Sequence, residues 1–424
     1  MNFRILLLFF LILPLGLSAQ RKEKPKMLVY GSNIAAFTAA LQAAKSNVPT
    51  VWVVNNEEIV PEFKGNFIKI SSNEHLDGGI WMSILMQMAI SKESNDSLAS
   101  VVKKDFNTRL AINAIEKMIT EQMNLTVIRN QTIKEYNKGK RDWTVYLSNN
   151  QKIEVVSIVD ATENSQLYSK YATTPKDNTP NDLVNAQDLS LALSRTSLAA
   201  AESNNQVKVL LLRDVIAFEK DNLFDLGLLR KIGDGPESLA IKASFGQAIG
   251  ATAAYTAFFK SNTSKIDIRK LQAELLTFKA RIMPYQDITI NDPHYSSIQK
   301  NYLTGFLLGK LEAGKYNFNK QELIKFDDIK PVFNDIYTRS QLWFLDNYRN
   351  DVMNWKELLG LIKFVSFKGE EVDKQVEKDW STKRKFEGSF NPETKVNKTH
   401  FAVMADLYTE SFAKSINIDG SFVK

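Results

Sequence analysis

The sequence contains no cysteine among its 424 residues. Disulfides, thiolate chemistry, cysteine-ligated metals and an N-terminal lipid-modified cysteine are therefore all excluded. Histidine is also scarce, because only His75, His294 and His400 occur and they lie far apart in the chain. None of them has a partner at metal-ligand spacing, so we expect structural histidines and predict no metal site.

Charge of one sign is not concentrated in any part of the chain. The formal net charge of +6 comes from 54 basic and 48 acidic residues that are spread along the whole length. A nucleic-acid-binding protein usually carries a block of basic residues that follows the phosphate backbone. The sequence therefore predicts a solvated surface and no nucleic-acid partner.

Long apolar runs are scarce as well, with one exception near the N-terminus. Arg4 is followed by an apolar run over residues 5–17 and then by Ser18 and Ala19 before Gln20. This order is typical of a secretory signal peptide, and the run is short for a transmembrane helix. We expect residues 1–19 to be removed, no stable membrane span to remain, and the mature protein to be periplasmic or secreted. An uncleaved anchor is the alternative.

The remaining chain is long enough for two domains, and its 44% hydrophobic content is ample for a buried core. We predict a Rossmann-like domain over residues 20–262, with a reduced insertion or cap at about 164–206. A mostly α-helical domain is expected over residues 263–424. The oligomeric state is left open.

Residues 27–54 have the pattern of a strand, a tight turn, an Ala-rich helix and a second strand. This is the opening unit of a dinucleotide-binding domain, in which the turn delivers a pyrophosphate to the N–H groups at a helix N-terminus. The glycine pattern is incomplete, because Asn33 and Ala36 follow Gly31, and Asn55 stands where an acidic residue usually ends the second strand. We expect a weakened cofactor site; the alternative is a unit retained only as scaffold.

Later segments extend the α/β pattern. We expect a long amphipathic helix over residues 97–122, a strand at 125–128, a β-ribbon, and a return strand that ends at Asp160. A Ser/Ala-rich stretch at 189–201 has helix-like composition, strands follow at 207–212 and 222–227, and residues 238–260 form a helix crowded with small residues. The predicted C-terminal helices lie at 268–278, 296–308, 338–348, 355–365 and 399–412.

Several segments, in this order along the chain, resemble the secreted bacterial FAD-dependent oxidoreductase family, which has a glutathione-reductase-like flavin fold. The matching segments are Tyr30–Ala36, Asp77–Ile80, Val159–Glu163, Asn222–Gly227 and Phe245–Gly250. The resemblance implies an α/β, three-layer FAD/NAD(P)-binding domain with a β-ribbon excursion. It places FAD nearest Gly31, Ser32, Asn33, Ala36, Asn55, Gly78, Gly79, Ala161, Thr162, Gly227, Gly246 and Gln247.

The departures from the family pattern are as informative as the matches. Asn33, Asn55 and Glu163 replace a glycine, an acid and a second glycine of three contact segments, and each loss could weaken FAD binding by about 1–3 kcal/mol. The insertion near residues 164–206 is also shorter than the family's substrate domain. FAD is therefore expected to be bound weakly or lost.

Two functions follow from the resemblance. One is an exported FAD-dependent oxidoreductase that acts on an unknown small molecule or carbohydrate. The other is a non-catalytic relative with a degenerate flavin site that serves as a binding or scaffold protein. His75, beside the Gly78–Gly79 pair, is a candidate acid or base, although an isolated loop histidine is usually only a hydrogen-bonding surface residue.

Overall fold

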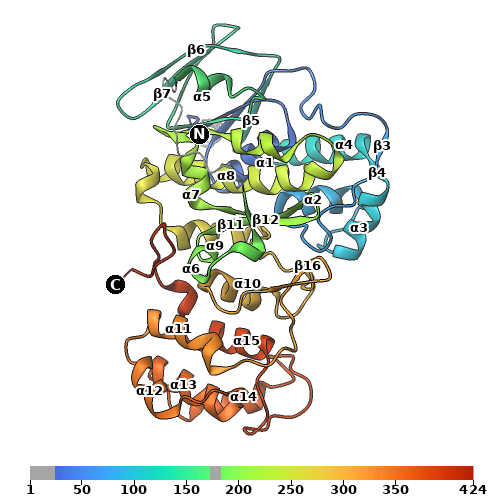
Figure 1. Ribbon diagram of the computed structural model, residues 1–424. Helices are drawn as coiled ribbons and strands as arrows, with labels where there is room; N and C mark the ends of the chain where they lie inside the picture. Colours follow the sequence, from blue (N-terminus) through green and yellow to red (C-terminus); the bar gives the residue numbers. More distant parts are fainter. Residues whose placement is uncertain (1–23, 172–182, 424) are drawn as a thin grey trace, which may run out of the picture.

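A computed structural model describes residues 24–171 and 183–423, so the expected signal peptide lies outside the described residues. Its centre is a six-stranded sheet with the order β13-β14-β9-β1-β2-β5 (Figure 1). Strands β14, β9, β1, β2 and β5 run parallel, and β13 is antiparallel to β14. The strands are β1 (Met27–Tyr30), β2 (Thr50–Val54), β5 (Leu125–Arg129), β9 (Ser157–Asp160), β13 (Glu219–Lys220) and β14 (Leu223–Asp225). This parallel, Rossmann-like core confirms the predicted α/β class.

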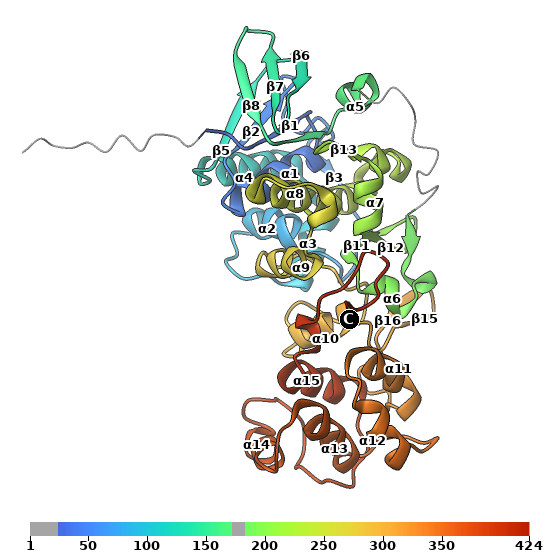
Figure 2. The ribbon, with the colours of Figure 1, turned by 90° about the vertical axis from the view of Figure 1, so that its left-hand side faces the viewer.

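The sheet is the middle of three layers, and its short apolar strands are covered on both faces. Side chains alternate along β1, so Leu28 and Tyr30 face the β-ribbon while Met27 and Val29 face the helices. The ribbon is the antiparallel sheet of β6 (Ile133–Lys138), β7 (Trp143–Leu147) and β8 (Lys152–Val155). Figure 2 shows the ribbon and the helices α1 and α8 on opposite sides of the sheet.

The helical layer is built on close contact between α1 (Ile34–Lys45) and α8 (Leu239–Phe259). Gly246 and Gly250 lie one helical turn apart and face Ala35 and Ala39 of α1. A Cβ at Gly246 would lie 2.5 Å from the carbonyl oxygen of Ala35, so the missing side chain sets the distance between the helices. The small residues of α8 thus serve helix packing.

The single long helix expected over residues 97–122 is wrong, because two helices occur there. They are α3 (Asp96–Lys104) and α4 (Thr108–Thr120), and the short strand β4 (Phe106–Asn107) separates them and pairs with β3 (Phe67–Ile68). The side chain of Asn107 accepts the N–H of Leu110 at 3.0 Å and so begins α4 anew. Helix α2 (Gly79–Met88) precedes this pair.

The helix-like stretch at residues 189–201 is also corrected. Only the short helix α6 (Leu191–Ser194) forms there, and β11 (Ser197–Ser203) follows as a strand. β11 pairs with β12 (Gln206–Leu211), which pairs with β10 (Val184–Asn185), and β11 packs against α8. Strand pairing over a buried face outweighs the local helix preference of alanine here. Helices α5 (Gln166–Tyr171) and α7 (Leu212–Ala217) flank this sheet in the sequence.

Helices dominate the rest of the chain, which lies below the sheet in Figure 1. They are α9 (Ile268–Thr277), α10 (Tyr295–Thr304), α11 (Phe326–Ile336), α12 (Ser340–Asn347), α13 (Trp355–Ser366), α14 (Glu371–Asp379) and α15 (Lys398–Tyr408). A small hairpin of β15 (Lys310–Glu312) and β16 (Lys315–Asn317) interrupts them, and the short 3₁₀ helices are η1 (Ala186–Asp188), η2 (Leu226–Ile232), η3 (Pro236–Ser238), η4 (Thr263–Lys265) and η5 (Ser411–Ala413). Over the described ranges, no helix is both long enough and apolar enough to cross a membrane.

Candidate functional site

The turn between β1 and α1 has a backbone conformation that requires glycine. Gly31 has a φ of +137°, and a Cβ there would lie 2.6 Å from the carbonyl oxygen of Ala161. Its N–H donates to the carbonyl of Val53 at 3.1 Å, and its carbonyl accepts the indole N–H of Trp52 at 2.8 Å. The carboxyl ends of β1, β2 and β9 therefore meet at this turn, which is where open α/β sheets bind their ligands.

Asn33 closes one side of the turn with its side chain. Its backbone is extended, with a φ of −165°, and it is the N-cap of α1. The Oδ1 atom accepts the N–H of Ala36 at 2.7 Å, and the Nδ2 atom donates to the carbonyl of Ala161 at 2.6 Å. The Asn33 side chain thus binds one of the free N–H groups at the start of α1 and links the turn to the end of β9.

A second donor of the same helix end is occupied by Glu62, which the sequence analysis did not single out. Its Oε1 atom accepts the N–H of Ile34 at 3.0 Å. Val60 and Phe63 on either side of it are buried, and this anchors the loop after β2 against the core. Oε2 is buried without a hydrogen-bond partner, and burial raises the pKa of Glu62. A carboxylate of the protein itself therefore lies where a helix N-terminus would receive an anion.

Asn55, at the end of β2, faces the same turn. The hydroxyl of Ser32 donates to its Oδ1 atom at 2.8 Å. The pair joins the turn to the second strand through neutral groups, and it lacks the carboxylate with which such a site binds ribose hydroxyls. Ser32 and Asn55 are thus brought together as expected, but they satisfy each other.

The predicted residues Gly78, Gly79 and Gln247 meet at the start of α2. Gly79 has a φ of +55°, and a Cβ there would collide with the Gln247 amide. Gln247 accepts the N–H of Ile80 at 3.0 Å through Oε1 and donates to Gln42 at 2.8 Å through Nε2. Its side chain is therefore fully used in linking α8, α2 and α1, and it is buried.

Gly246, which precedes Gln247, lies in the interior of α8 and packs on the backbone of Ala35. The helix begins at Leu239, one residue after its predicted start at residue 238. Gly246 and Gln247 are close to the dinucleotide turn in space. Gly246 packs against α1, and Gln247 forms hydrogen bonds with both α1 and α2.

Ala161 and Thr162 follow β9, where Asp160 organises the chain. Its Oδ1 atom accepts from the N–H and hydroxyl of Thr162 at 3.1 and 2.7 Å, and Oδ2 accepts the N–H groups of Leu167 and Tyr168 at the start of α5. Asp160 is fully buried, and burial raises its pKa. The carboxylate thus caps a helix of the protein.

Gly227, the last predicted contact, follows Asp225 at the end of β14. Asp225 accepts the hydroxyl of Ser165 at 2.5 Å and the guanidinium of Arg230 at 3.2 Å. Arg230 also donates to the carbonyl of Gly227, and its side chain occupies the space beside that residue. Burial raises the pKa of Asp225 to about 6, and the nearby Asp160 acts in the same direction. Gly227 therefore belongs to a polar cluster of its own strand end.

His75 lies in the loop before α2 with a φ of 57°. Its Nε2 atom is 3.9 Å from a carboxylate oxygen of Glu74, and Nδ1 is buried without a partner. The next carboxylate, Asp77, forms a buried ion pair with Lys103 at 2.6 Å. A catalytic role for His75 stays a prediction. No group of three or more acidic or histidine side chains that could hold a metal occurs in the described parts of the chain.

The structure thus brings most of the predicted residues to one edge of the sheet, and it pairs them with one another. The assignment of these residues to FAD stays a prediction. The contacts do not fit a bound pyrophosphate as they stand, because Asn33 and Glu62 already accept the N–H groups that the phosphates would use. A phosphate would also have to approach the half-buried Glu62 carboxylate, a group of like charge.

No family model matches the chain, and no curated protein matches it. Among solved structures, the bacillithiol disulfide reductase from Staphylococcus aureus is 11% identical with a TM-score of 0.23, and the match covers 33% of this chain and 38% of that protein. The thioredoxin reductase from Lactococcus lactis is 13% identical with a TM-score of 0.23, with 38% and 39% covered. A structure of OTEMO in complex with FAD and NADP is 10% identical with a TM-score of 0.22, with 33% and 26% covered. The chain therefore matches well under half the length of each protein, and likeness at this level does not extend to a shared function.

Proposed function

We infer that this protein is a non-catalytic binding protein built on a flavoprotein-like Rossmann fold whose cofactor turn is closed. The observation that carries this is the hydrogen bond from the N–H of Ile34 to Glu62 at the start of α1. An internal carboxylate there satisfies the helix end without a ligand. In this proposal the protein is exported, and its partner is a small molecule or carbohydrate bound elsewhere.

The closed turn is reinforced by independent contacts. Asn33 caps the helix and binds the carbonyl of Ala161, and Ser32 binds Asn55. Bound dinucleotide would have to displace two of these side chains, and each hydrogen bond left unmade inside the protein is worth about 1–3 kcal/mol. Two or three such losses lower affinity by several powers of ten.

A weakly binding FAD-dependent oxidoreductase is the second candidate, and one observation favours it. Gly31 keeps a conformation that glycine alone adopts readily, and the ends of β1 and β9 still meet there. If FAD did bind, the flavin would supply the redox chemistry, and this chain would contribute the turn at Gly31 and the N–H groups of α1.

An absorbance spectrum separates the two functions. The purified full-length protein is incubated with excess FAD and then freed of unbound FAD. We expect no flavin absorption bands, because the phosphate-binding groups are occupied. Wild-type protein that retains stoichiometric flavin would overturn the proposed function and establish the second candidate.

A variant tests the physical cause. Glu62→Ala combined with Asn33→Gly frees both helix donors, and Asn55→Glu restores a carboxylate for ribose. FAD affinity of this triple variant should exceed that of the wild type by at least tenfold, since several contacts of about 1 kcal/mol are regained. A matched exposed substitution, Glu377→Ala on α14, should leave FAD affinity unchanged.

A further inference from the structure

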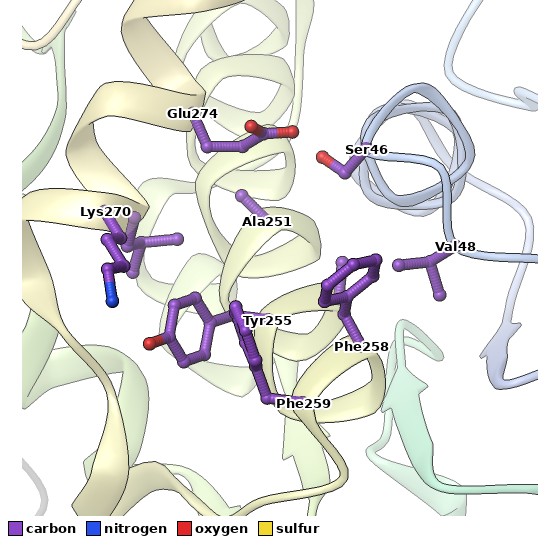
Figure 3. Close-up of a pocket in the computed structure, with 10 residues that line it drawn as sticks. Ser46, Val48, Ala251, Tyr255, Phe258, Phe259, Lys270 and Glu274 are labelled. Atoms are coloured by element: carbon purple, nitrogen blue, oxygen red, sulfur yellow. The ribbon is translucent and has the colours of Figure 1, made fainter.

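A groove of about 190 Å³ lies at the opposite end of α1 and α8 from the dinucleotide turn. Ser46 and Val48 follow the end of α1 on one side, and Lys270, Leu271 and Glu274 of α9 lie on the other. The last turns of α8 form its floor (Figure 3). This volume suits a ligand smaller than a typical drug-sized molecule.

One wall of the groove is aromatic. The rings of Tyr255 and Phe259 lie 4.6 Å apart between centroids, and those of Phe258 and Phe259 lie 5.0 Å apart at an angle of 77°. Phe258 and Phe259 are 50% and 53% exposed, which is high for phenylalanine. The wall therefore offers ring faces, with their negative π-electron density, to a bound group.

The groove also carries charged groups, and one carboxylate points into it. Glu274 is half-buried and reaches across the groove toward Ser46, and no residue in the described ranges pairs with its carboxylate. Lys270 is 3.5 Å from Asp267, which offsets its charge, and Lys45 points over the ring of Phe278. The C-terminal ends of α1 and α8 both lie here, and a helix C-terminus carries a partial negative charge.

We propose that this groove binds a small organic ammonium ion, with the cationic group between the Glu274 carboxylate and the faces of Phe258, Phe259 and Tyr255. Aromatic faces recognise quaternary ammonium groups through cation–π attraction, and a carboxylate adds the attraction of an opposite charge. An anionic ligand would face the unpaired carboxylate and two helix ends of unfavourable sign. A neutral apolar ligand would leave the Glu274 charge without a partner. The proposal is independent of the state of the dinucleotide turn.

The test uses the full-length protein and choline as the probe, with 3,3-dimethylbutan-1-ol as the neutral isostere. Binding of each is measured by calorimetric titration to wild type, Glu274→Gln, Phe259→Leu and the control Glu377→Gln on α14. Circular dichroism checks that each variant is folded, and Glu274 and Phe259 are exposed enough for both substitutions to be tolerated.

The expected result is that wild type prefers choline over the isostere by about tenfold. Glu274→Gln should lower that preference to about one, Phe259→Leu should weaken choline binding several-fold, and Glu377→Gln should match wild type. Equal binding of both probes, or none, would overturn the proposal. Self-association that rises with protein concentration and is removed by Phe259→Leu would also overturn it, because the groove would then be an interface between copies. Whether the same samples retain flavin does not change this result. The experiment therefore tests the groove independently of the proposed function.

Discussion

Carboxylates that are buried or half-buried are the most distinctive single residues at the carboxyl edge of the sheet. Glu62, Asp160 and Asp225 each accept hydrogen bonds from the protein, and burial raises the pKa of each. Raised carboxyl pKa values often mark functional sites, but here every one of these groups caps a helix or joins a strand end. At this scale the edge is a structural network more than a reaction centre.

Asp225 gives a testable dependence of stability on pH. Its pKa is about 6 in the folded protein against an ordinary value of 3.8. At a pH between these two values, the folded state therefore keeps a proton that the unfolded state has lost. The resulting contribution to the free energy of unfolding is present below about pH 4 and lost as the pH rises through about 6; its size is roughly 3 kcal/mol.

Urea unfolding of wild type and Asp225→Asn between pH 4 and 7 measures this contribution. The variant should lose less stability than wild type as the pH rises, and the exposed control Asp142→Asn should follow wild type. His400 acts in the opposite sense, because burial lowers its pKa to about 4, but it is common to all three proteins and cancels in the comparison. Identical pH profiles for wild type and Asp225→Asn would contradict the prediction.

At the scale of elements, the helices α1 and α8 depend on glycine for their approach. Gly246→Ala places a Cβ 2.5 Å from the Ala35 carbonyl oxygen, so we expect a loss of about 1–3 kcal/mol in the free energy of unfolding. Gly360 in α13 is the matched control, because a Cβ there would meet nothing closer than Trp343 at 3.7 Å. Gly360→Ala should raise stability by up to about 1 kcal/mol through helix propensity. Thermal and urea unfolding of both variants check this, and equal effects would refute the packing argument.

In the helical region, the segments that precede three of the helices are joined by backbone hydrogen bonds that the sequence does not predict. Ile324, Met353 and Val396 precede α11, α13 and α15 and form a ring of three backbone hydrogen bonds, each 3.0 Å long. Each donates its N–H to the carbonyl of the next, and all three side chains are buried. The ring thus ties together three segments that are far apart in the sequence.

At the scale of the whole molecule, the C-terminal segment ties the helical region to the second sheet. Arg195 donates to the carbonyls of Thr304 and Gly420, each at 3.0 Å, and Arg269 donates to those of Leu303 and Lys414 at 2.9 and 3.0 Å. Both guanidinium groups are buried, and burial lowers the pKa of Arg269 to about 9. Hydrogen bonds to backbone carbonyl groups therefore offset most of the free-energy cost of burying these two positive charges.

Removal of residues 414–424 takes away two of these carbonyl partners. We expect the truncated protein to lose about 2–5 kcal/mol of unfolding free energy, because the arginines would be left buried with unmade hydrogen bonds. Removal of residues 423–424 removes one backbone bond of the segment and neither arginine contact, so it serves as the control. Calorimetric melting of both truncations measures the difference. A full truncation as stable as the control would show that the segment is not needed.

The order of local elements was determined by the sequence itself. Periods of two and 3.6 residues, turn residues and the Gly31 turn are short-range signals, and they specified β1, α1, β2, the ribbon and the small-residue helix without any contact information. The strand β11 was missed because its alanines favour a helix locally, and only pairing with β12 over α8 makes them a strand.

Only the tertiary structure shows that the N–H groups of the candidate site are already bonded to side chains of the protein. Glu62 lies 28 residues beyond Ile34 in the sequence, and its local signal is only an acidic residue near the buried Val60 and Phe63. The same holds for Gln247, which contacts α1 and α2 across a separation of more than 160 residues. Hydrogen bonds between residues so far apart in the sequence depend on how helices and strands pack against each other. A local sequence pattern does not specify that packing.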